Sequence, residues 1–301
     1  MASVCESLAA CFFLFSTAAQ VGQNPSPMVE TTRSHPRLPQ ATPEGRRIDL
    51  ELGTLFVPEA LADRRELPVF LHFHGGTWLP EVAASRAAHA AVITIQLGSG
   101  SSAYARAFVD ATSLQRLLTE AQEKCGLRFT QVGLTAWSAG YGAVREVLKV
   151  ADNYERVDFV LLIDGLHASY ASGKPGPRES ELVSEHLEEF LRFARDAVAG
   201  NKQMVLTHSE IFPGTYASTT ETADYLLNNL GLGRTAVLKW GPMGTQQLSE
   251  VQKGKFLLVG YAGNSAPDHV DQLHSLPDYL EWIDWGAPDD GETRPRGSKE
   301  E

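Results

Sequence analysis

The sequence predicts an α/β fold whose central sheet is mostly parallel and is covered by helices on both faces. Short apolar runs bounded by polar residues, which indicate buried strands, alternate along the chain with segments whose apolar residues recur at helical spacing. This alternation is typical of a parallel sheet joined by crossover helices. With 301 residues, 43% of them hydrophobic, the chain is long enough to bury one large core. We therefore expect a single α/β domain.

The first half of the domain begins with residues 48–58, whose loose alternation of apolar and polar side chains predicts a hairpin or an edge strand. Buried strands are predicted at Pro68–Phe73 and Ala91–Leu97. A helix follows, with Gly126 after its end and five residues on one face: Leu114, Leu117, Leu118, Ala121 and Cys125. Cys125 is therefore expected in the core.

The second half repeats the same alternation. Four strands are predicted, at Phe129–Thr135, Phe159–Ile163, Met204–Thr207 and Phe256–Tyr261. Two helices are predicted between these strands in the first part of this half: a short one following residue 140 and a long amphipathic one at Glu179–Ala199. A third opens with the capping box Ser218-Thr-Thr-Glu221 and ends at Gly231. A closing helix contains Leu276, Leu280 and Trp282.

The amino end carries a candidate targeting segment. Leu8–Ala19 is an apolar block that is too short to span a bilayer but long enough for the core of a signal peptide. Thr17 and Ala19 stand at the positions that a signal peptidase reads, although no Lys or Arg precedes the block. We interpret residues 1–19 as a signal peptide and expect a secreted or periplasmic protein. Without export, the protein is cytoplasmic.

The remaining segments differ in composition. Residues 20–45 are rich in Pro, Ser, Thr and Gln and are expected to form a flexible leader, and the charged residues 289–301 are expected to form a disordered tail. The folded domain is then residues 46–288. The mature chain has no segment that predicts stable insertion into a membrane, and the sequence does not indicate an oligomeric state.

Charge and motifs exclude several functional classes. A net charge of −11 has the wrong sign for a protein that binds nucleic acid through phosphates. No glycine-rich phosphate loop is present, so no nucleotide cofactor is expected. His72, His167 and His208 fall near strand ends, but without a His-x-x-x-His or a cysteine pair they predict no metal site.

The strongest motif joins the strand Phe129–Thr135 to the helix that follows it. Ala136-Trp137-Ser138-Ala139-Gly140 places small residues two before and two after a serine, as a very sharp strand-to-helix turn requires. This turn, which we call the elbow, resembles the nucleophile elbow of the α/β-hydrolase superfamily, with Ala136 in place of the usual first glycine. The resemblance covers roughly residues 48–285 and implies that Ser138 is the nucleophile. An ordinary serine in a turn is the alternative.

A second motif follows the strand Pro68–Phe73. Two glycines in His74-Gly75-Gly76 would let backbone N–H groups approach a ligand closely, as stabilisation of an oxyanion requires. The segment resembles the His-Gly-Gly loop of esterases and lipases, which implies an oxyanion hole formed by Gly75, Gly76 and the backbone N–H of Ala139. A glycine turn without function is the alternative.

The base and the acid of a catalytic triad each have two candidates. His269 stands after the last strand, where a loop enters a helix behind Pro267, and is favoured over His274, which is expected inside that helix. Asp164 ends a strongly apolar strand, where an unpaired carboxylate is costly, and is favoured over Glu210. The order Ser138, Asp164, His269 is similar to the superfamily's order of nucleophile, acid and base.

These residues together predict a serine hydrolase that cleaves carboxylic esters of small molecules through an acyl-enzyme, without a cofactor. Trp78, Trp137 and Tyr141, next to the predicted catalytic groups, are candidate walls of the substrate pocket. Two alternatives stay open: a hydrolase of amide, lactone or carbohydrate-ester bonds, and a binding protein that has the fold without turnover.

Overall fold

The computed structural model of the chain describes residues 34–176 and 180–286. The predicted signal peptide at residues 1–19 and the predicted tail at 289–301 lie outside the described residues. None of the helices that the structure describes is both long and apolar enough to cross a bilayer.

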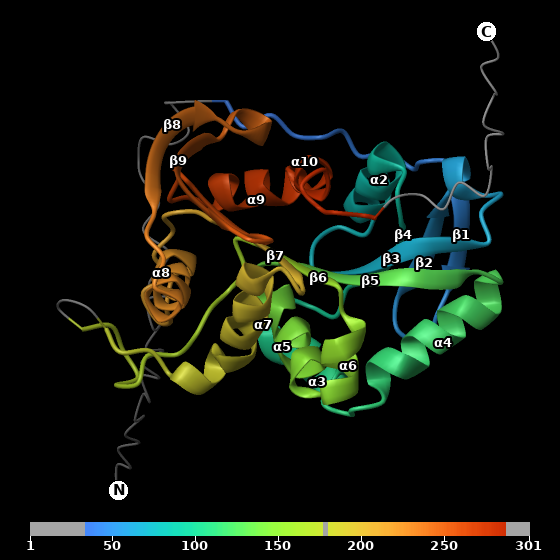
Figure 1. Cartoon of the computed structure of the whole chain (residues 1–301). Coiled ribbons are helices and arrows are strands. Elements are labelled where there is room, and N and C mark those ends of the chain that lie inside the picture. The colour runs from blue at the N-terminus through green and yellow to red at the C-terminus, as the bar shows by residue number, and fades with distance from the viewer. Residues whose placement is uncertain (1–33, 177–179, 287–301) are drawn as a thin grey trace, which may run out of the picture.

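One ten-stranded sheet runs through the described part of the chain, in the order β1-β2-β4-β3-β5-β6-β7-β10-β9-β8 (Figure 1). The six strands from β4 to β10 pair in parallel, and the strands outside them pair antiparallel. The strands are β1 (Gly45–Asp49), β2 (Thr54–Pro58), β3 (Glu66–Phe73), β4 (Ala91–Ile95), β5 (Arg128–Trp137), β6 (Phe159–Ile163), β7 (Gln203–His208), β8 (Thr235–Trp240), β9 (Gln246–Lys253) and β10 (Phe256–Tyr261). The predicted mostly parallel centre is confirmed.

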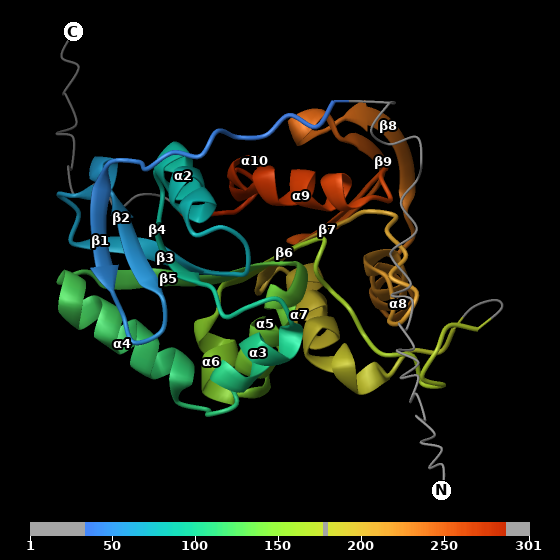
Figure 2. The same cartoon turned by 180° about the vertical axis from the view of Figure 1, so that it is seen from behind.

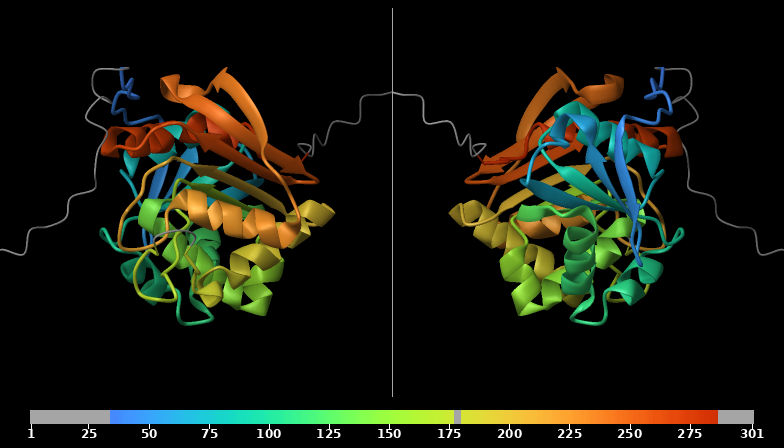
Figure 3. Two further views of the ribbon diagram at one scale, coloured as in Figure 1. Left: turned by 90° about the vertical axis from the view of Figure 1, so that its left-hand side faces the viewer. Right: turned by 90° about the vertical axis from the view of Figure 1, so that its right-hand side faces the viewer.

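Helices cover both faces of the sheet (Figures 1 and 3). One face carries α2 (Trp78–Ala87), α9 (Ala266–His274) and α10 (Leu276–Leu280). The other carries α3 (Ser101–Ala107), α4 (Ser113–Cys125), α5 (Tyr141–Lys149), α6 (Ala151–Arg156), α7 (Glu188–Ala199) and α8 (Thr219–Leu230). Because successive strand residues point to opposite faces, Phe70 joins the core under α2 and α10 while its neighbour Leu71 joins the core over α4, α5 and α7. Cys125 is buried at the end of α4, as predicted.

Residues 34–44, which we call the strap, have no regular secondary structure and run along the outer side of α9 and α2 to β1 (Figure 2). Arg37 pairs with Asp271 of α9 at 3.0 Å, and the backbone N–H of Leu38 donates to Nδ1 of His274 at 3.0 Å. Leu38 is buried. The strap falls in the segment predicted to be a flexible leader, and these contacts hold it to the folded domain ahead of residue 46.

Several parts of the fold differ from the sequence prediction, and the helices α2, α3 and α6 were not predicted. The long helix predicted at residues 179–199 begins only at Glu188, because Leu182 and Val183 pair with Tyr170 and Ser169 in a strand-like bridge instead. The hairpin of β8 and β9 was not predicted from the sequence. The residues of β9 are mostly polar, and the short strand β8 is largely exposed at the sheet edge although it contains Val237, Leu238 and Trp240.

Candidate active site

The candidate residues follow parallel strands whose carboxyl ends meet at one edge of the sheet. His74 follows β3, Ser138 follows β5 and Asp164 follows β6, and these three strands are neighbours. His269 lies in the first turn of α9, after β10. Open α/β sheets bind ligands at this edge.

The elbow holds Ser138 in a left-handed backbone conformation with φ of 48°. The turn is tightly enclosed. A Cβ at Gly140 would lie 2.2 Å from the carbonyl oxygen of Phe73, and one at Gly165 would lie 2.5 Å from the backbone nitrogen of Ser138. Both positions therefore require glycine, and the backbones of three neighbouring strand ends close around the serine.

His269 is held by three groups. Its Nδ1 lies 2.7 Å from Oδ2 of Asp164. The indole ring of Trp137 stacks on its ring at a centroid distance of 4.5 Å, and Nε1 of the same indole donates to the backbone oxygen of His269 at 3.0 Å. The side chain of His269 is 22% exposed, so solvent or a ligand reaches it. Because Trp137 precedes Ser138 directly, the stacking also brings His269 to the elbow.

Asp164 is 2% exposed and, besides contacting His269, accepts three hydrogen bonds from two residues. The backbone N–H and the hydroxyl of Ser209 each donate at 2.8 Å, and the hydroxyl of Thr219 donates at 2.7 Å. Burial favours a higher pKa for Asp164. This effect is outweighed by the hydrogen bond to His269, by the charge of that ring and by the donors of Ser209 and Thr219. The pKa of Asp164 is therefore held well below its usual range. Asp164 therefore carries a negative charge at neutral pH.

The alternative residues lie elsewhere. Glu210 is exposed, and its backbone N–H donates to Gly263 at 2.8 Å. His274 is buried with its Nδ1 on the strap and its ring against Trp78, at a centroid distance of 5.8 Å. The structure thus brings Asp164 and His269 together and does not bring Glu210 or His274 to that pair.

The glycine loop, residues 74–76, borders the same site. His74 has φ of 74°, its Nδ1 lies 2.9 Å from the hydroxyl of Tyr104, and its ring stacks on the other side of Trp137 at 5.1 Å. Burial, followed by the charge of His269, lowers the pKa of His74, so this ring is neutral at pH 7. Gly75 packs against Leu273 of α9, Gly76 is exposed, and Ala139 of the elbow is buried.

The three aromatic residues predicted to line a pocket have different surroundings. Trp137 lies between His74 and His269. Tyr141 contacts the ring of His167 at 5.6 Å and donates to the hydroxyl of Ser101 at 3.3 Å. Trp78 lies at the start of α2 beneath the glycine loop. All three are partly exposed.

Three residues that contact the candidate groups are not predicted from the sequence: Ser209, Thr219 and Tyr104. Ser209 directly follows the apolar strand that precedes Glu210, so its place at a strand end is the one signal that could have found it. Thr219 lies within the capping box that opens α8, but that motif predicts only the start of a helix, and Tyr104 of α3 has no neighbouring motif. Their contacts depend on how separate elements pack.

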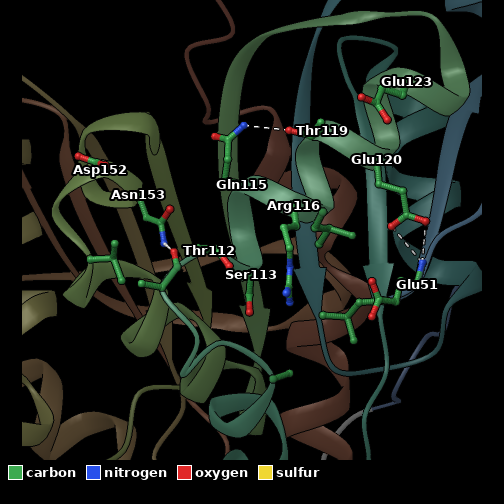
Figure 4. A pocket seen from close by; sticks show the side chains of 15 residues that line it. Glu51, Thr112, Ser113, Gln115, Arg116, Thr119, Glu120, Glu123, Asp152 and Asn153 are labelled. Carbon is green, nitrogen blue, oxygen red and sulfur yellow. Dashed lines mark hydrogen bonds between the residues drawn. The ribbon is translucent and has the colours of Figure 1, made fainter.

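Two hollows of about 780 and 890 Å³ lie away from these residues. The first lies between α4, Glu51 and the start of α6, and Glu120, Glu123 and Asp152 give it acidic walls (Figure 4). Neither hollow is lined by Ser138, Asp164 or His269. The candidate site at the strand ends is thus separate from both hollows.

One cluster in the described chain has the residue types of a metal site: His35, Asp268 and Asp271 offer ligand atoms within 4.8 Å of one another. Asp271 already contacts Nδ1 of His35 at 2.7 Å and the guanidinium of Arg37, and Asp268 caps α9 through Ser265. These contacts give both carboxylates a structural role that needs no metal ion.

The sequence matches no protein-family model and no curated protein. Among solved structures, an acetyl xylan esterase from Aspergillus awamori has a TM-score of 0.44 at 12% identity, covering 81% of this chain and 100% of that chain. An S-formylglutathione hydrolase from Agrobacterium tumefaciens has a TM-score of 0.43 at 12% identity, covering 82% and 97%. LAE6, an α/β hydrolase from the metagenome of Lake Arreo, has a TM-score of 0.45 at 13% identity, covering 80% and 86%.

At these TM-scores and identities, the likeness assigns neither an activity nor a substrate to this chain. The fold follows from features of the molecule itself. The central parallel strands of the sheet have the order β4-β3-β5-β6-β7-β10. The serine elbow follows β5, and a histidine follows β10, the last parallel strand in the chain. The chain therefore has the α/β-hydrolase fold.

Proposed function

We propose that the protein is a serine hydrolase that cleaves carboxylic esters. Ser138 is the nucleophile, His269 the general base and Asp164 the acid that orients it. The observation that carries the proposal is the 2.7 Å contact between Nδ1 of His269 and the buried carboxylate of Asp164, beside the elbow of Ser138. A carboxylate with these donors keeps the proton of His269 on Nδ1, which leaves Nε2 free to accept another.

The reaction then proceeds in two steps. His269 accepts the proton of Ser138 Oγ as this oxygen attacks the ester carbonyl, and the protonated imidazole returns the proton to the leaving alcohol. His269 then accepts a proton from water as the water attacks the acyl-enzyme. The bond between the acyl carbon and Ser138 Oγ breaks, His269 returns the proton to this oxygen, and the carboxylic acid is released. Asp164 stays ionised and stabilises the imidazolium that forms in each step.

The oxyanion that forms in each step needs donors placed before the reaction. Backbone N–H groups of Gly75, Gly76 and Ala139 are the proposed donors. The close packing of Gly140 on Phe73 supports this role, because it holds the elbow against the end of β3, where the glycine loop begins. The same arrangement accepts an amide, lactone or carbohydrate ester, so the ester class is a matter for experiment.

Labelling with a fluorophosphonate probe tests the nucleophile. We expect the purified protein to be labelled at Ser138 and the Ser138→Ala variant to be unlabelled and inactive on p-nitrophenyl butyrate, with a melting temperature close to the parent's. Ser172→Ala, a change at an exposed serine outside the site, is the matched control and should keep both labelling and turnover. Absence of labelling in the parent protein would favour the binding-protein alternative.

The same assay ranks the remaining residues. We expect His269→Ala to lose about as much as Ser138→Ala, on the order of 10³-fold or more, because nucleophile and base act as one unit. Asp164→Asn should lose less than either, and exposed Glu210→Gln least of all. If Glu210→Gln proved more damaging than Asp164→Asn, the proposed acid would be wrong.

A further inference from the structure

His167 is a polar residue beside the candidate site. The reaction proposed above does not use it. It lies three residues after Asp164, and the charges of Asp164 and His269 both act on its titration. Its ring contacts Tyr141, which follows Ser138 by three residues, at a centroid distance of 5.6 Å. His167 therefore lies on the rim of the elbow, on the side of Tyr141.

Hydrogen bonding determines which nitrogen of His167 is free. Nδ1 lies 2.9 Å from the backbone oxygen of Ala217, and because a carbonyl only accepts, Nδ1 carries the proton. Burial lowers the pKa of His167 below its usual value, so the ring is neutral at pH 7. Nε2 is then a bare acceptor. No described residue forms a hydrogen bond with this Nε2 atom. The atom is not fully buried, so solvent can reach it.

The bond to Ala217 does not by itself explain the imidazole. The two loops that it joins are already paired, since the backbone N–H of Ala217 donates to the oxygen of Ala168 at 2.9 Å. The side chain at position 167 takes no part in this backbone pairing. What the imidazole adds is an acceptor of fixed orientation that faces outward.

Two aromatic rings contact the ring of His167. Tyr216, 41% exposed, packs against His167 edge to face at a centroid distance of 4.9 Å. The hydroxyl of Tyr141 donates to that of Ser101, which can in turn donate to another group. A few placed polar groups among aromatic rings are typical of small-molecule sites.

We infer that Nε2 of His167, flanked by Tyr141 and Tyr216, forms a subsite for a hydroxyl group carried by the ester substrate, in its alcohol or in its acyl part. A hydroxyl matches the subsite because it can donate to the bare nitrogen. This inference rests on the proposed esterase function and makes His167 a residue that determines specificity. It has no part in the bond-breaking steps.

Matched substrates test the subsite. In one pair the alcohol part differs (glyceryl butyrate against propyl butyrate), and in the other the acyl part differs (p-nitrophenyl 3-hydroxybutyrate against p-nitrophenyl butyrate). We expect a preference of about 10-fold in kcat/KM for the hydroxylated ester of at least one pair, since that is the net effect of one hydrogen bond. The pair that responds identifies the part of the substrate that carries the hydroxyl.

Three variants separate the acceptor from general damage. His167→Phe keeps a flat ring but removes the acceptor and should abolish the preference while leaving turnover of the plain ester nearly unchanged. His167→Gln, which can still accept, should keep most of the preference. His186→Phe is the matched control, because His186 also bonds this loop, through the N–H of Ser169, yet has no contact with the site residues. It should behave as the parent protein.

The outcomes are distinct. If the parent protein hydrolyses the plain esters without any preference, or if His167→Phe keeps the preference, the subsite is wrong and the esterase function stands. If no ester is hydrolysed and Ser138 is not labelled, the proposed function fails and the subsite fails with it. Labelling of Ser138 in His167→Phe shows that this variant is folded.

Discussion

Five described residues other than glycine have a positive φ, and three of them are His74, Ser138 and Asp164. Such a conformation costs about 1–3 kcal/mol per residue and persists only where the surroundings impose it. Here the surroundings are specific: Tyr104 contacts His74, Ser209 and Thr219 hold Asp164, and the Gly140 and Gly165 contacts enclose Ser138. The strain is thus concentrated where three strands deliver the candidate catalytic groups.

Trp137 makes two contacts with His269, the proposed base. In the proposed mechanism it takes no part in proton transfer or in bond breaking. Trp137→Phe keeps a ring between His74 and His269 but loses the hydrogen bond to the His269 backbone, so kcat should fall by roughly 10-fold. Trp137→Leu loses the stacking too and should fall further, with KM changing little in both variants. Steady-state kinetics on p-nitrophenyl butyrate measure both constants.

Trp285→Phe is the control for this prediction. The indole of Trp285 also donates to a backbone oxygen, that of Leu280, but lies away from the site. It should match Trp137→Phe in thermal stability and match the parent protein in kcat. Equal loss of kcat in the two variants would mean that Trp137 acts through global stability and not by positioning His269.

At the scale of elements, the strap lies against the helix that carries His269. Arg37 pairs with the fully buried carboxylate of Asp271 and donates to the backbone oxygen of Pro267, so its contacts fall on both sides of His269 along α9. Arg37→Gln should therefore destabilise the protein by roughly 1–3 kcal/mol, because a buried carboxylate loses this ion pair. We expect kcat for p-nitrophenyl butyrate to fall as well. Urea unfolding and kinetics measure the two effects.

The matched control is Arg128→Gln. Arg128 pairs with Glu66, but both side chains are largely exposed, and exposed ion pairs contribute little to stability. This variant should unfold near the urea midpoint of the parent protein and keep its kcat. If Arg37→Gln were equally mild, the strap would be a surface segment without influence on α9.

At the scale of the whole molecule, two buried histidines link stability to pH. Burial lowers the pKa of His72 to about 3, and burial together with the charge of Arg234 lowers that of His208 to about 4. Between pH 6.5 and 4 the unfolded chain protonates these rings and the folded chain does not. The unfolding free energy should therefore fall as the pH falls, by up to about 1.4 kcal/mol per pH unit for each ring. Urea unfolding at pH 7, 6, 5 and 4 measures this slope.

His72→Leu tests the larger of the two shifts. Nδ1 of His72 lies 2.7 Å from the hydroxyl of Thr135, which donates to Leu71, and its buried Nε2 has no partner among the described residues. The variant removes that unpaired atom and leaves the bond from Thr135 to Leu71, so the slope should become shallower. The exposed His89 provides a control, since His89→Gln should keep the slope of the parent protein. An unchanged slope in His72→Leu would exclude His72 as the source.

Much of the fold could be predicted because its pattern is local. The parallel strands are buried on both faces, so Pro68–Phe73 and Phe159–Ile163 stand out as apolar runs. The capping boxes at Ser218 and Ser265 begin α8 and α9 in the structure, although only the first was predicted. Elements with little buried surface, such as β8, carry no such pattern and were missed.

By itself, the sequence determined the α/β class and the small residues of the elbow around Ser138, because each depends on residue types close together in the chain. The roles of Ser138, Asp164 and His269 stay predictions. Only the tertiary structure decided which carboxylate contacts His269. Asp164 and Glu210 follow neighbouring parallel strands and therefore arrive at the same edge of the sheet. Asp164 turns inward with φ of 43° onto the donors of Ser209 and Thr219, while Glu210 stays in solvent. Those donors come from separate elements, α8 among them, and only packing brings them to the carboxylate.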